Sequence, residues 1–394
     1  MALRDVFVVG AARTPVGSFQ GQFASVPAPQ LGATAIKAAV DRAAVDPADV
    51  QRCYMGNVLS AGIGQAPARQ AALQAKLPQS APCITVSKVC GSGMEAVIMA
   101  SRVLMIGDAD VVVAGGMENM TMTPYALPAA RSGLRMNDNV VKDLMVFDGL
   151  WDPYGDQHMG MFAEMCAEKY GFTREAQDLL AMNSYERAQA AIADGTFARE
   201  IAPVAIPQRK GDPQMITEDE EPKRYRKDKV SSLKPAFKKD GTVTAVNASS
   251  INDGAAALVL ASGEAVKERG LKPLARLVSH GGHAQEPAWF TTAPVGASRK
   301  ALERAGWRSG DIDYWEVNEA FAVVAMAARQ DLEIPDDHLN IHGSGCSIGH
   351  PIGCTGARII VTLVNILHEK QAARGLATLC IGGGEGLATI WERV

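Results

Sequence analysis

The sequence predicts an α/β protein in which two copies of one unit, each a sheet covered by helices, are separated by an inserted region. Short apolar runs bounded by turn residues alternate with Ala-rich stretches of helical spacing along most of the 394-residue chain. This alternation is typical of parallel sheets covered by helices. The order helix, Asp-containing turn and strand occurs before Asn57 and again before Asn318. Such an internal echo predicts two fused copies.

The elements of the first copy follow from hydrophobic periodicity. The apolar run DVFVVGAA at 5–12 predicts a strand, and the Ala-rich stretch at 28–45 has helical spacing. The run DVVVAGG at 110–116 predicts a further strand. Just before it, MEAVIMASRVLMIG at 94–107 is apolar nearly all round, which predicts a buried helix.

The region between the two copies has a different character. It is rich in Met, Pro and charged residues, and it contains one clear helical pattern at 175–193 but no clear sheet pattern. Long insertions of this kind often carry binding specificity. We therefore expect a first core half made of 1–119 plus 250–272, an inserted loop domain at 120–249 and a second core half at 273–394.

Composition excludes several classes of protein. A net charge of −4 is too small to favour nucleic acid or an anionic membrane surface, and no apolar run approaches a membrane span. The first residues show no signal-peptide pattern. The seven cysteines are scattered without a C-x-x-C pair, so the spacing indicates neither a zinc ribbon nor a redox dithiol, and no metal is expected. Reduced thiols in a cytoplasmic protein fit this pattern best.

One cysteine stands at the start of the predicted buried helix. Cys90 is followed directly by Gly-Ser-Gly. Unpaired N–H groups and the helix dipole at such a position favour a thiolate, so Cys90 is a candidate nucleophile. The alternative is a small core residue, which would be the better interpretation for a lone cysteine. The Gly-rich helix start reverses that preference for Cys90.

Three candidate partners occur in the second copy. His350 lies in a Gly- and Pro-containing turn equivalent to the Cys90 turn, and a histidine can deprotonate a thiol near neutral pH. Cys380 ends a strand and precedes three glycines that would expose it. Asn318 follows a strand, where polar residues of α/β sheets line sites. For His350 and Asn318 the alternative is a structural cap.

Together these pieces resemble the thiolase family. The motifs CGSGMEAV, VNEAF, GHPIGCTGAR and CIGGGEG occur in the family's order, and the match covers nearly the whole chain. The resemblance implies a thiolase-like duplicated α-β-α-β-α layered core, with five strands in each half and an inserted loop domain. It also implies a homodimer or homotetramer, and 131–143 resembles the segment through which tetrameric members pair their dimers.

The resemblance further implies an activity: reversible condensation of two acetyl-CoA to acetoacetyl-CoA and CoA. Coenzyme A and acyl-CoA would be substrates, with no permanently bound cofactor. Cys90 would carry the acyl group, His350 would take its proton, and Cys380 would exchange a proton with the α-carbon or the CoA thiol. One oxyanion pocket would use His350 and a water held by Asn318. The other would use the backbone N–H groups of Cys90 and Gly382.

A second set of residues matches family positions near CoA. These are His158, Met159, Arg224, Phe237 and Ser249. Arg224 belongs to a basic cluster suited to the nucleotide phosphates. For most of that cluster a solvated loop is the alternative, and for Met159 and Phe237 it is core packing.

Departures from the family pattern leave the substrate open. This chain has His342 and Cys346 before the histidine turn, and Glu385 where relatives more often carry an uncharged residue. The alternative activity is therefore that of a 3-oxoacyl-CoA thiolase of fatty-acid β-oxidation acting on longer chains. A decarboxylating ketoacyl synthase is disfavoured by Cys380. A catalytically inactive binding protein should have lost Cys90, His350 or Cys380.

Overall fold

A mixed β-sheet organises the molecule. The computed structural model describes residues 3–394, and within them ten strands form one sheet of order β14-β15-β16-β13-β1-β12-β5-β3-β4, with β2 paired to β12. Their bounds are β1 Val6–Arg13, β2 Gly17–Ser18, β3 Arg52–Gly56, β4 Cys83–Val86, β5 Val111–Asn119, β12 Asn252–Ser262, β13 Ala275–Ala284, β14 Tyr314–Val317, β15 Arg374–Ile381 and β16 Glu385–Arg393.

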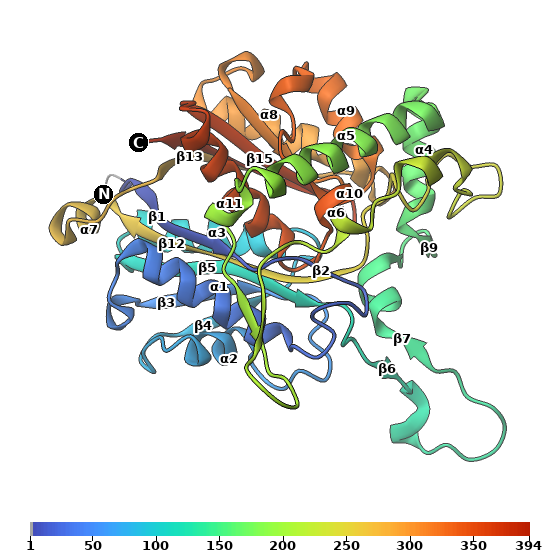
Figure 1. Cartoon of the computed structure of the whole chain (residues 1–394), viewed down its shortest axis with the longest axis horizontal. Helices are drawn as coiled ribbons and strands as arrows, with labels where there is room; N and C mark the ends of the chain where they lie inside the picture. The colour runs from blue at the N-terminus through green and yellow to red at the C-terminus, as the bar shows by residue number, and fades with distance from the viewer. Residues whose placement is uncertain (1–2) are drawn as a thin grey trace.

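Helices cover the sheet in layers (Figure 1). Their bounds are α1 Ala28–Ala43, α2 Pro67–Gln74, α3 Ser92–Met105, α7 Gly263–Arg269, α8 Ala293–Ala305, α9 Ala322–Leu332, α10 Gly345–Ile348 and α11 Thr355–Glu369. Helix α1 packs on β1, β5 and β12, and α8 packs on β13, β15 and β16. Between these two parts of the sheet, α3 and α11 contact each other and strands of both parts. The order of layers is therefore α-β-α-β-α, as the resemblance implied.

The chain is duplicated in three dimensions. In the first half β3 pairs in parallel with β5 and β4; in the second, β14 pairs in parallel with β15. The antiparallel pairs β5–β12 and β15–β16 also correspond. The second-half counterpart of β4 is only an isolated bridge between Trp315 and Leu339. The expectation of five full strands in each half is therefore wrong for the second half, which has four and this bridge.

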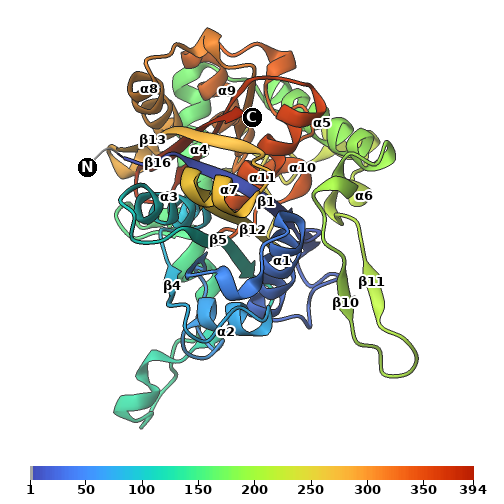
Figure 2. The same ribbon diagram turned by 90° about the vertical axis from the view of Figure 1, so that its left-hand side faces the viewer.

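The two halves share one continuous sheet because β1 pairs with β13. This ladder is short, with Phe7 opposite Arg276 and Val8 opposite Ala275. Viewed from the side, β1, β13 and β16 run next to one another across the junction (Figure 2). The link lies far from the strand ends that carry the predicted site residues.

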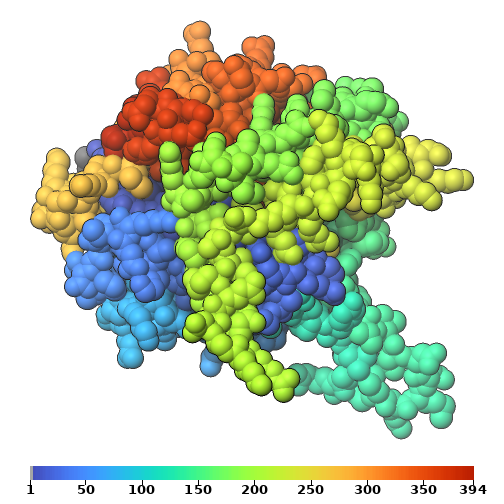
Figure 3. Space-filling model, viewed as in Figure 1, coloured from blue at the N-terminus to red at the C-terminus, as the bar shows by residue number. Residues whose placement is uncertain are grey.

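The inserted region contains helices and small hairpins. Its bounds are α4 Met159–Tyr170, α5 Arg174–Ala193, α6 Glu221–Arg224, β6 Tyr125–Ala126, β7 Lys142–Asp143, β8 Trp151–Asp152, β9 Gln157–His158, β10 Val204–Ile206 and β11 Gln214–Ile216. The helix predicted at 175–193 is confirmed as α5. The three two-stranded pairs had no visible pattern in the sequence, since each strand has only two or three residues. The β6–β7 arm projects from the body, whereas the β10–β11 hairpin lies along it (Figure 3).

Burial is deepest in the middle layer. Helix α3 carries the apolar stretch predicted as a buried helix, and most of its side chains are buried. Helix α11 is buried along nearly its whole length. A buried helix has a fixed N-terminus, so both helix starts are rigid positions for side chains. Within residues 3–394 no helix is both long enough and apolar enough to cross a membrane.

Candidate active site

A cavity of about 280 Å³ opens where the starts of α3 and α11 meet the inserted region. Three of the predicted catalytic residues, Cys90, His350 and Gly382, line it. The rest of the lining is mostly apolar: Val89, Met120, Leu150, Met159, Phe237, Ile251, Phe290, Phe321 and Ile352. The two halves and the insertion therefore each contribute to one partly open, largely apolar space, as is typical of ligand sites.

A strained turn presents Cys90 to this cavity. The preceding residue, Val89, has φ of +44°, a conformation that a β-branched residue rarely adopts. The turn is held by Ser92, whose Oγ accepts from Lys88 N at 2.8 Å and donates to Val89 O at 2.7 Å. The cysteine thus sits at a fixed, sharp corner between β4 and α3.

The structure corrects the expected ionisation of Cys90. Burial raises the pKa of its thiol to about 11, although the backbone N–H groups of Gly382 and of Cys90 itself hydrogen-bond the sulfur and act to lower it. The helix start alone therefore does not make a thiolate in the empty site, because desolvation outweighs the N–H donors. A base is needed to remove the proton.

The surroundings of His350 make it such a base. Its Nδ1 lies 2.7 Å from Thr355 Oγ1, and that hydroxyl lies 2.9 Å from Pro351 O, to which it donates its only proton. Thr355 must then accept from Nδ1–H, which leaves Nε2 as the bare nitrogen. Nε2 is buried and has no hydrogen-bond partner among the described residues. It is a free acceptor at the cavity.

Burial also keeps this imidazole neutral. It lowers the pKa of His350 to about 3, and the nearby positive charge of Arg358 acts in the same direction. At neutral pH the ring is therefore unprotonated, so the lone pair of Nε2 is available. The preceding residue, Gly349, has φ of +108°, and a Cβ there would lie 2.4 Å from the Asn252 side chain. Only glycine fits this turn, which orients the histidine.

Cys380 lies just behind the cavity wall. It is fully buried near the end of β15, and the glycine turn 382–384 follows. Burial and the adjacent Cys90 sulfur raise the pKa of Cys380 well above its ordinary value. Because the Cys90 thiol acts on the pKa of Cys380, the two side chains lie near each other. The expectation that the glycines expose Cys380 is wrong, because the side chain is 0% exposed.

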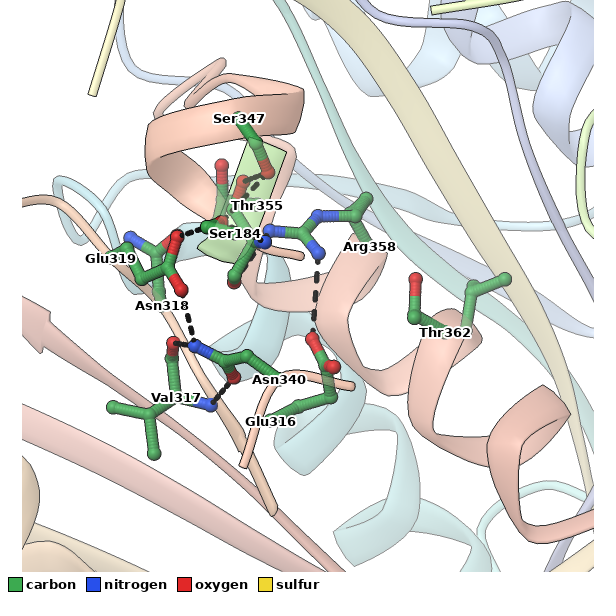
Figure 4. A network of polar contacts seen from close by, with 12 residues as sticks. Ser184, Glu316, Val317, Asn318, Glu319, Asn340, Ser347, Thr355, Arg358 and Thr362 are labelled. Atoms are coloured by element: carbon green, nitrogen blue, oxygen red, sulfur yellow. Dashed lines mark hydrogen bonds and ion pairs between the residues drawn. The ribbon is translucent and has the colours of Figure 1, made fainter. Parts of the chain in front are cut away.

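Asn318 lies between Val317 and Glu319, which a polar network holds in place (Figure 4). Its Nδ2 lies 3.5 Å from His350 Nδ1, and its Oδ1 is buried without a partner in the described part of the chain. The adjacent Glu319 accepts from Ser184 Oγ at 2.6 Å and from Asn340 Nδ2 at 2.8 Å. Asn340 also pairs with both backbone groups of Val317 at 2.8 Å. The end of β14 is therefore fixed on both sides of Asn318.

The two halves touch through backbone at the site. A Cβ on Gly116 at β5 would lie 2.0 Å from Gly353 O, just before α11. No side chain fits there, so the second half's turn rests directly on the first half's strands. The Gly353 N–H also donates to Glu118 at 2.9 Å. This close contact fixes the distance between the Cys90 and His350 turns.

Four of the five residues predicted near CoA line the same cavity: His158, Met159, Phe237 and Ser249. The His158 ring stacks on Phe237 with centroids 4.7 Å apart. Its Nδ1 accepts from Gly160 N at 3.1 Å, so the free Nε2 carries the proton. Arg224 is the exception. Its side chain is 59% exposed and lines a separate surface hollow with Tyr225, Leu233 and Val246.

The departures from the family pattern lie outside the cavity lining. Glu385 forms an ion pair with Lys88, which joins the glycine turn to the Cys90 turn. His342 pairs with Glu369 at 2.7 Å, and Cys346 is fully buried below Glu319. Among residues 3–394 no cluster of three or more His, Cys, Asp or Glu side chains is arranged to hold a metal ion.

Sequence reasoning missed the supporting residues. Thr355, which fixes the tautomer of His350, is the first residue of α11, five residues after the histidine, and no helical spacing connects the two. Ser184 and Asn340 come from distant segments, so no local signal points to them. Lys88 and Glu385 are 297 residues apart, and their pairing also needs the fold.

Comparison with known proteins identifies the family over nearly the whole chain. The thiolase N-terminal domain model matches residues 6–264, and the thiolase C-terminal domain model matches 271–393. The chain is 51% identical over 392 residues to an acetyl-CoA acetyltransferase from Cupriavidus necator, covering 99% of this chain and 100% of that one. It is 49% identical to one from Schizosaccharomyces pombe, with 100% of each chain covered.

Solved structures agree as well. An acetyl-CoA acetyltransferase from Syntrophomonas wolfei superposes with a TM-score of 0.97 at 42% identity, covering 100% of both chains. A thiolase from Ascaris suum in complex with coenzyme A superposes with a TM-score of 0.94 at 40% identity, covering 99% of this chain and 100% of that one. On these matches, and with the cysteine and histidine turns facing one cavity, the chain belongs to the thiolase family.

Proposed function

We propose that the protein is an acetyl-CoA C-acetyltransferase, which joins two acetyl-CoA into acetoacetyl-CoA and CoA and also catalyses the reverse cleavage. The observation that carries the proposal is the meeting of Cys90, the bare Nε2 of His350 and the Gly382 N–H at one apolar cavity. The names of relatives at about 50% identity over the whole chain support the acetyl substrate. The alternative of a longer-chain β-oxidation thiolase is not favoured by these relatives.

In the first half-reaction Cys90 becomes acylated. Its Sγ attacks the acetyl-CoA carbonyl carbon, and its proton passes to His350 Nε2. The carbon–sulfur bond to CoA breaks, and the departing sulfur takes the proton of Cys380. This leaves acetyl-Cys90, a protonated His350, a Cys380 thiolate and free CoA. The raised pKa of Cys380 suits this step, because the residue begins as a thiol that can donate.

The second half-reaction restores each group. The Cys380 thiolate removes a proton from the methyl carbon of a second acetyl-CoA, and that carbon attacks the acetyl-Cys90 carbonyl. The Cys90 sulfur leaves and regains its proton from His350. During both attacks the N–H groups of Cys90 and Gly382 stabilise the oxygen of the Cys90-bound acetyl group. We assign the thioester oxygen of the second acetyl-CoA to His350 and to a water held by Asn318.

Coenzyme A would reach Cys90 along the insertion. The stacked His158 and Phe237, together with Met159 and Ser249, form the wall suited to an extended thiol arm. His158 offers its Nε2–H as a donor. We place the nucleotide end outside the cavity, toward the hollow beside Arg224, whose exposed guanidinium suits phosphate.

The size of the cavity fits a short acyl group. Beyond the thiol arm, the aromatic rings of Phe237, Phe290 and Phe321 close the space, with the last two centroids 6.4 Å apart. Accordingly, we assign acetyl and acetoacetyl groups to it. In this proposal CoA and acyl-CoA are substrates and not resident cofactors. The reaction, which forms or breaks a carbon–carbon bond, belongs to lipid metabolism.

Assembly and location are part of the proposal. The β6–β7 arm exposes apolar side chains, including Met136 at 83% and Val140 at 71%, which favours burial against other copies in a homotetramer. All seven cysteines are free thiols in the described residues, which favours the reducing cytoplasm.

The test is CoA-dependent cleavage of acetoacetyl-CoA compared with 3-oxohexanoyl-CoA and 3-oxodecanoyl-CoA, with Cys90→Ala as control. Cleavage confined to acetoacetyl-CoA and absent in the variant supports the proposal. Faster cleavage of the longer substrates would assign the longer-chain activity instead. Absence of all three cleavages in the wild-type protein would contradict the catalytic assignment.

A further inference from the structure

Two cysteines outside the candidate active site face each other across neighbouring strands. Cys53 on β3 and Cys83 on β4 are direct partners in a parallel pair, so their side chains leave the same face of the sheet, toward α2. Neighbouring strands lie about 4.8 Å apart, within the Cα separation of about 4.4–6.8 Å that a disulfide allows. We propose that Cys53 and Cys83 form an oxidisable dithiol that hydrogen peroxide converts to a disulfide.

Cys83 is the thiol that reacts first. It is partly exposed, whereas Cys53 is 0% exposed. Arg69 of α2 lies over it, with Nη1 at 3.8 Å from the sulfur, and two backbone carbonyls hold the guanidinium in place, Ala81 O and Gln79 O, each at 2.7 Å. A fixed positive charge beside a small, accessible thiol is the environment of reactive cysteines.

The second thiol supports the same ionisation. A hydrogen bond from Cys53 and the charge of Arg69 lower the pKa of Cys83 to about 6, although burial opposes this. Donation to Cys83 and burial raise the pKa of Cys53. The pKa of Cys83 is thus lowered beside a partner whose pKa is raised, whereas burial raises the pKa of the catalytic Cys90 to about 11.

The chemistry then takes two balanced steps. The Cys83 thiolate attacks one peroxide oxygen and breaks the O–O bond, which gives Cys83 sulfenic acid and, after proton uptake, water. The Cys53 sulfur attacks the Cys83 sulfur, its proton joins the departing hydroxide as a second molecule of water, and the S–S bond forms. Two thiols are oxidised and one peroxide is reduced.

Peptide mapping of the full-length protein tests this. Reduced wild-type protein is treated at pH 7 with increasing hydrogen peroxide, remaining thiols are alkylated, and the digest is analysed without reductant. We expect a Cys53–Cys83 linked peptide at peroxide levels that leave Cys90 alkylatable. If Cys53 and Cys83 stay alkylatable while Cys90 is oxidised, the proposal is wrong. The readout is mass, so it does not depend on the proposed activity.

Alkylation rates give an independent measurement. Between pH 7 and pH 5 iodoacetamide labelling of Cys83 should slow about tenfold, against about a hundredfold for an ordinary thiol. A hundredfold fall at Cys83 would remove the basis for its reactivity. Arg69→Gln should steepen the fall in the labelling rate of Cys83 toward the value for an ordinary thiol.

Two further variants test the order of the steps. In Cys53→Ala, dimedone should trap Cys83 sulfenic acid without any linked peptide. Cys346→Ala, which removes another buried thiol, should leave the Cys53–Cys83 linked peptide unchanged.

Discussion

Asn57 and Asn318 occupy the same place in the two halves, directly after β3 and β14, yet their surroundings differ. Asn57 donates to Glu118 Oε1 at 2.7 Å, and Glu118 also receives the N–H of Gly353 from the other half. Asn318 instead lies 3.5 Å from His350. Duplication therefore supplied a polar side chain at the same strand end twice. Asn57 hydrogen-bonds Glu118, which connects the two halves, whereas Asn318 lies beside the candidate base His350.

The two helix starts differ in the same way. Cys90 precedes α3 and lines the cavity, whereas Cys354 caps α11 and is 1% exposed. Burial raises the pKa of both thiols, that of Cys354 to about 12. Position at a helix start is thus not sufficient for a nucleophile. Access to the cavity and a neighbouring bare imidazole nitrogen distinguish Cys90.

The largest loss of activity should separate the two cysteines when each is replaced by alanine in turn. Cys90→Ala should lower kcat for acetoacetyl-CoA cleavage on the order of 10⁴-fold or more, because no acyl-enzyme can form. Cys354→Ala is the matched control and should lower it less than about tenfold, since it only removes buried packing. Steady-state kinetics measures both. Equal losses in the two variants would contradict the distinction between the helix starts.

The paired asparagines should separate activity from stability. Asn318→Ala should lower kcat about 10²–10³-fold, the usual loss for one oxyanion donor, with the melting temperature little changed. Asn57→Ala should instead cost about 1–3 kcal/mol of unfolding free energy, because Glu118 loses a buried donor. Kinetics and thermal unfolding of both variants provide the test. A drop in kcat for Asn57→Ala as large as that for Asn318→Ala would break the comparison.

The pH dependence of labelling should distinguish buried from charge-assisted thiols. With a pKa of about 11, Cys90 is protonated at neutral pH, so iodoacetamide labelling of the empty enzyme should rise about a hundredfold from pH 7 to pH 9. Cys83, with a pKa of about 6, is already a thiolate and should hardly change over this range. Site-resolved mass spectrometry measures both rates. If the labelling rate of Cys90 already reached a plateau near pH 7, Cys90 would be a thiolate at neutral pH, which would contradict the raised pKa.

The smallest effect should come from the ion pair that joins the two turns around Cys90. Glu385→Gln should lower kcat by no more than about fivefold, because a partly exposed ion pair contributes roughly 0–1 kcal/mol. Lys88→Gln should produce a similar loss, and the double variant should lose no more than either single one. Additive losses would mean that the two residues act separately.

Much of this organisation could be predicted from the sequence. The apolar periodicity located α3 and α5, and the internal echo located Asn57 and Asn318 at equivalent strand ends. The bridge that replaces a full strand at Leu339 could not be predicted, because its pattern is too short. The ionisation of Cys90 was also missed, since burial depth depends on how the two halves and the insertion close over it.

The residues of the candidate site also differ in whether the sequence alone could reveal them. His350 was predicted from its local, glycine-rich turn, and the role of Gly382 from the resemblance to the thiolase family. The hydroxyl of Thr355 and the network around Glu319 depend on contacts between distant segments, and only the fold brings those segments together. Arg224 was predicted near CoA, and its position outside the cavity leaves that role a proposal.

The most direct test determines which residue acetyl-CoA acetylates and whether that acetylation depends on His350. Wild-type protein, Cys90→Ala and His350→Ala would be mixed with acetyl-CoA, quenched in acid within one turnover and mapped by mass spectrometry. We predict an acetyl group on Cys90 in the wild type, none in Cys90→Ala, and much slower acetylation in His350→Ala. Acetylation of Cys380 instead, or unchanged acetylation of Cys90 without His350, would contradict the claim that the two halves act together on one thiol.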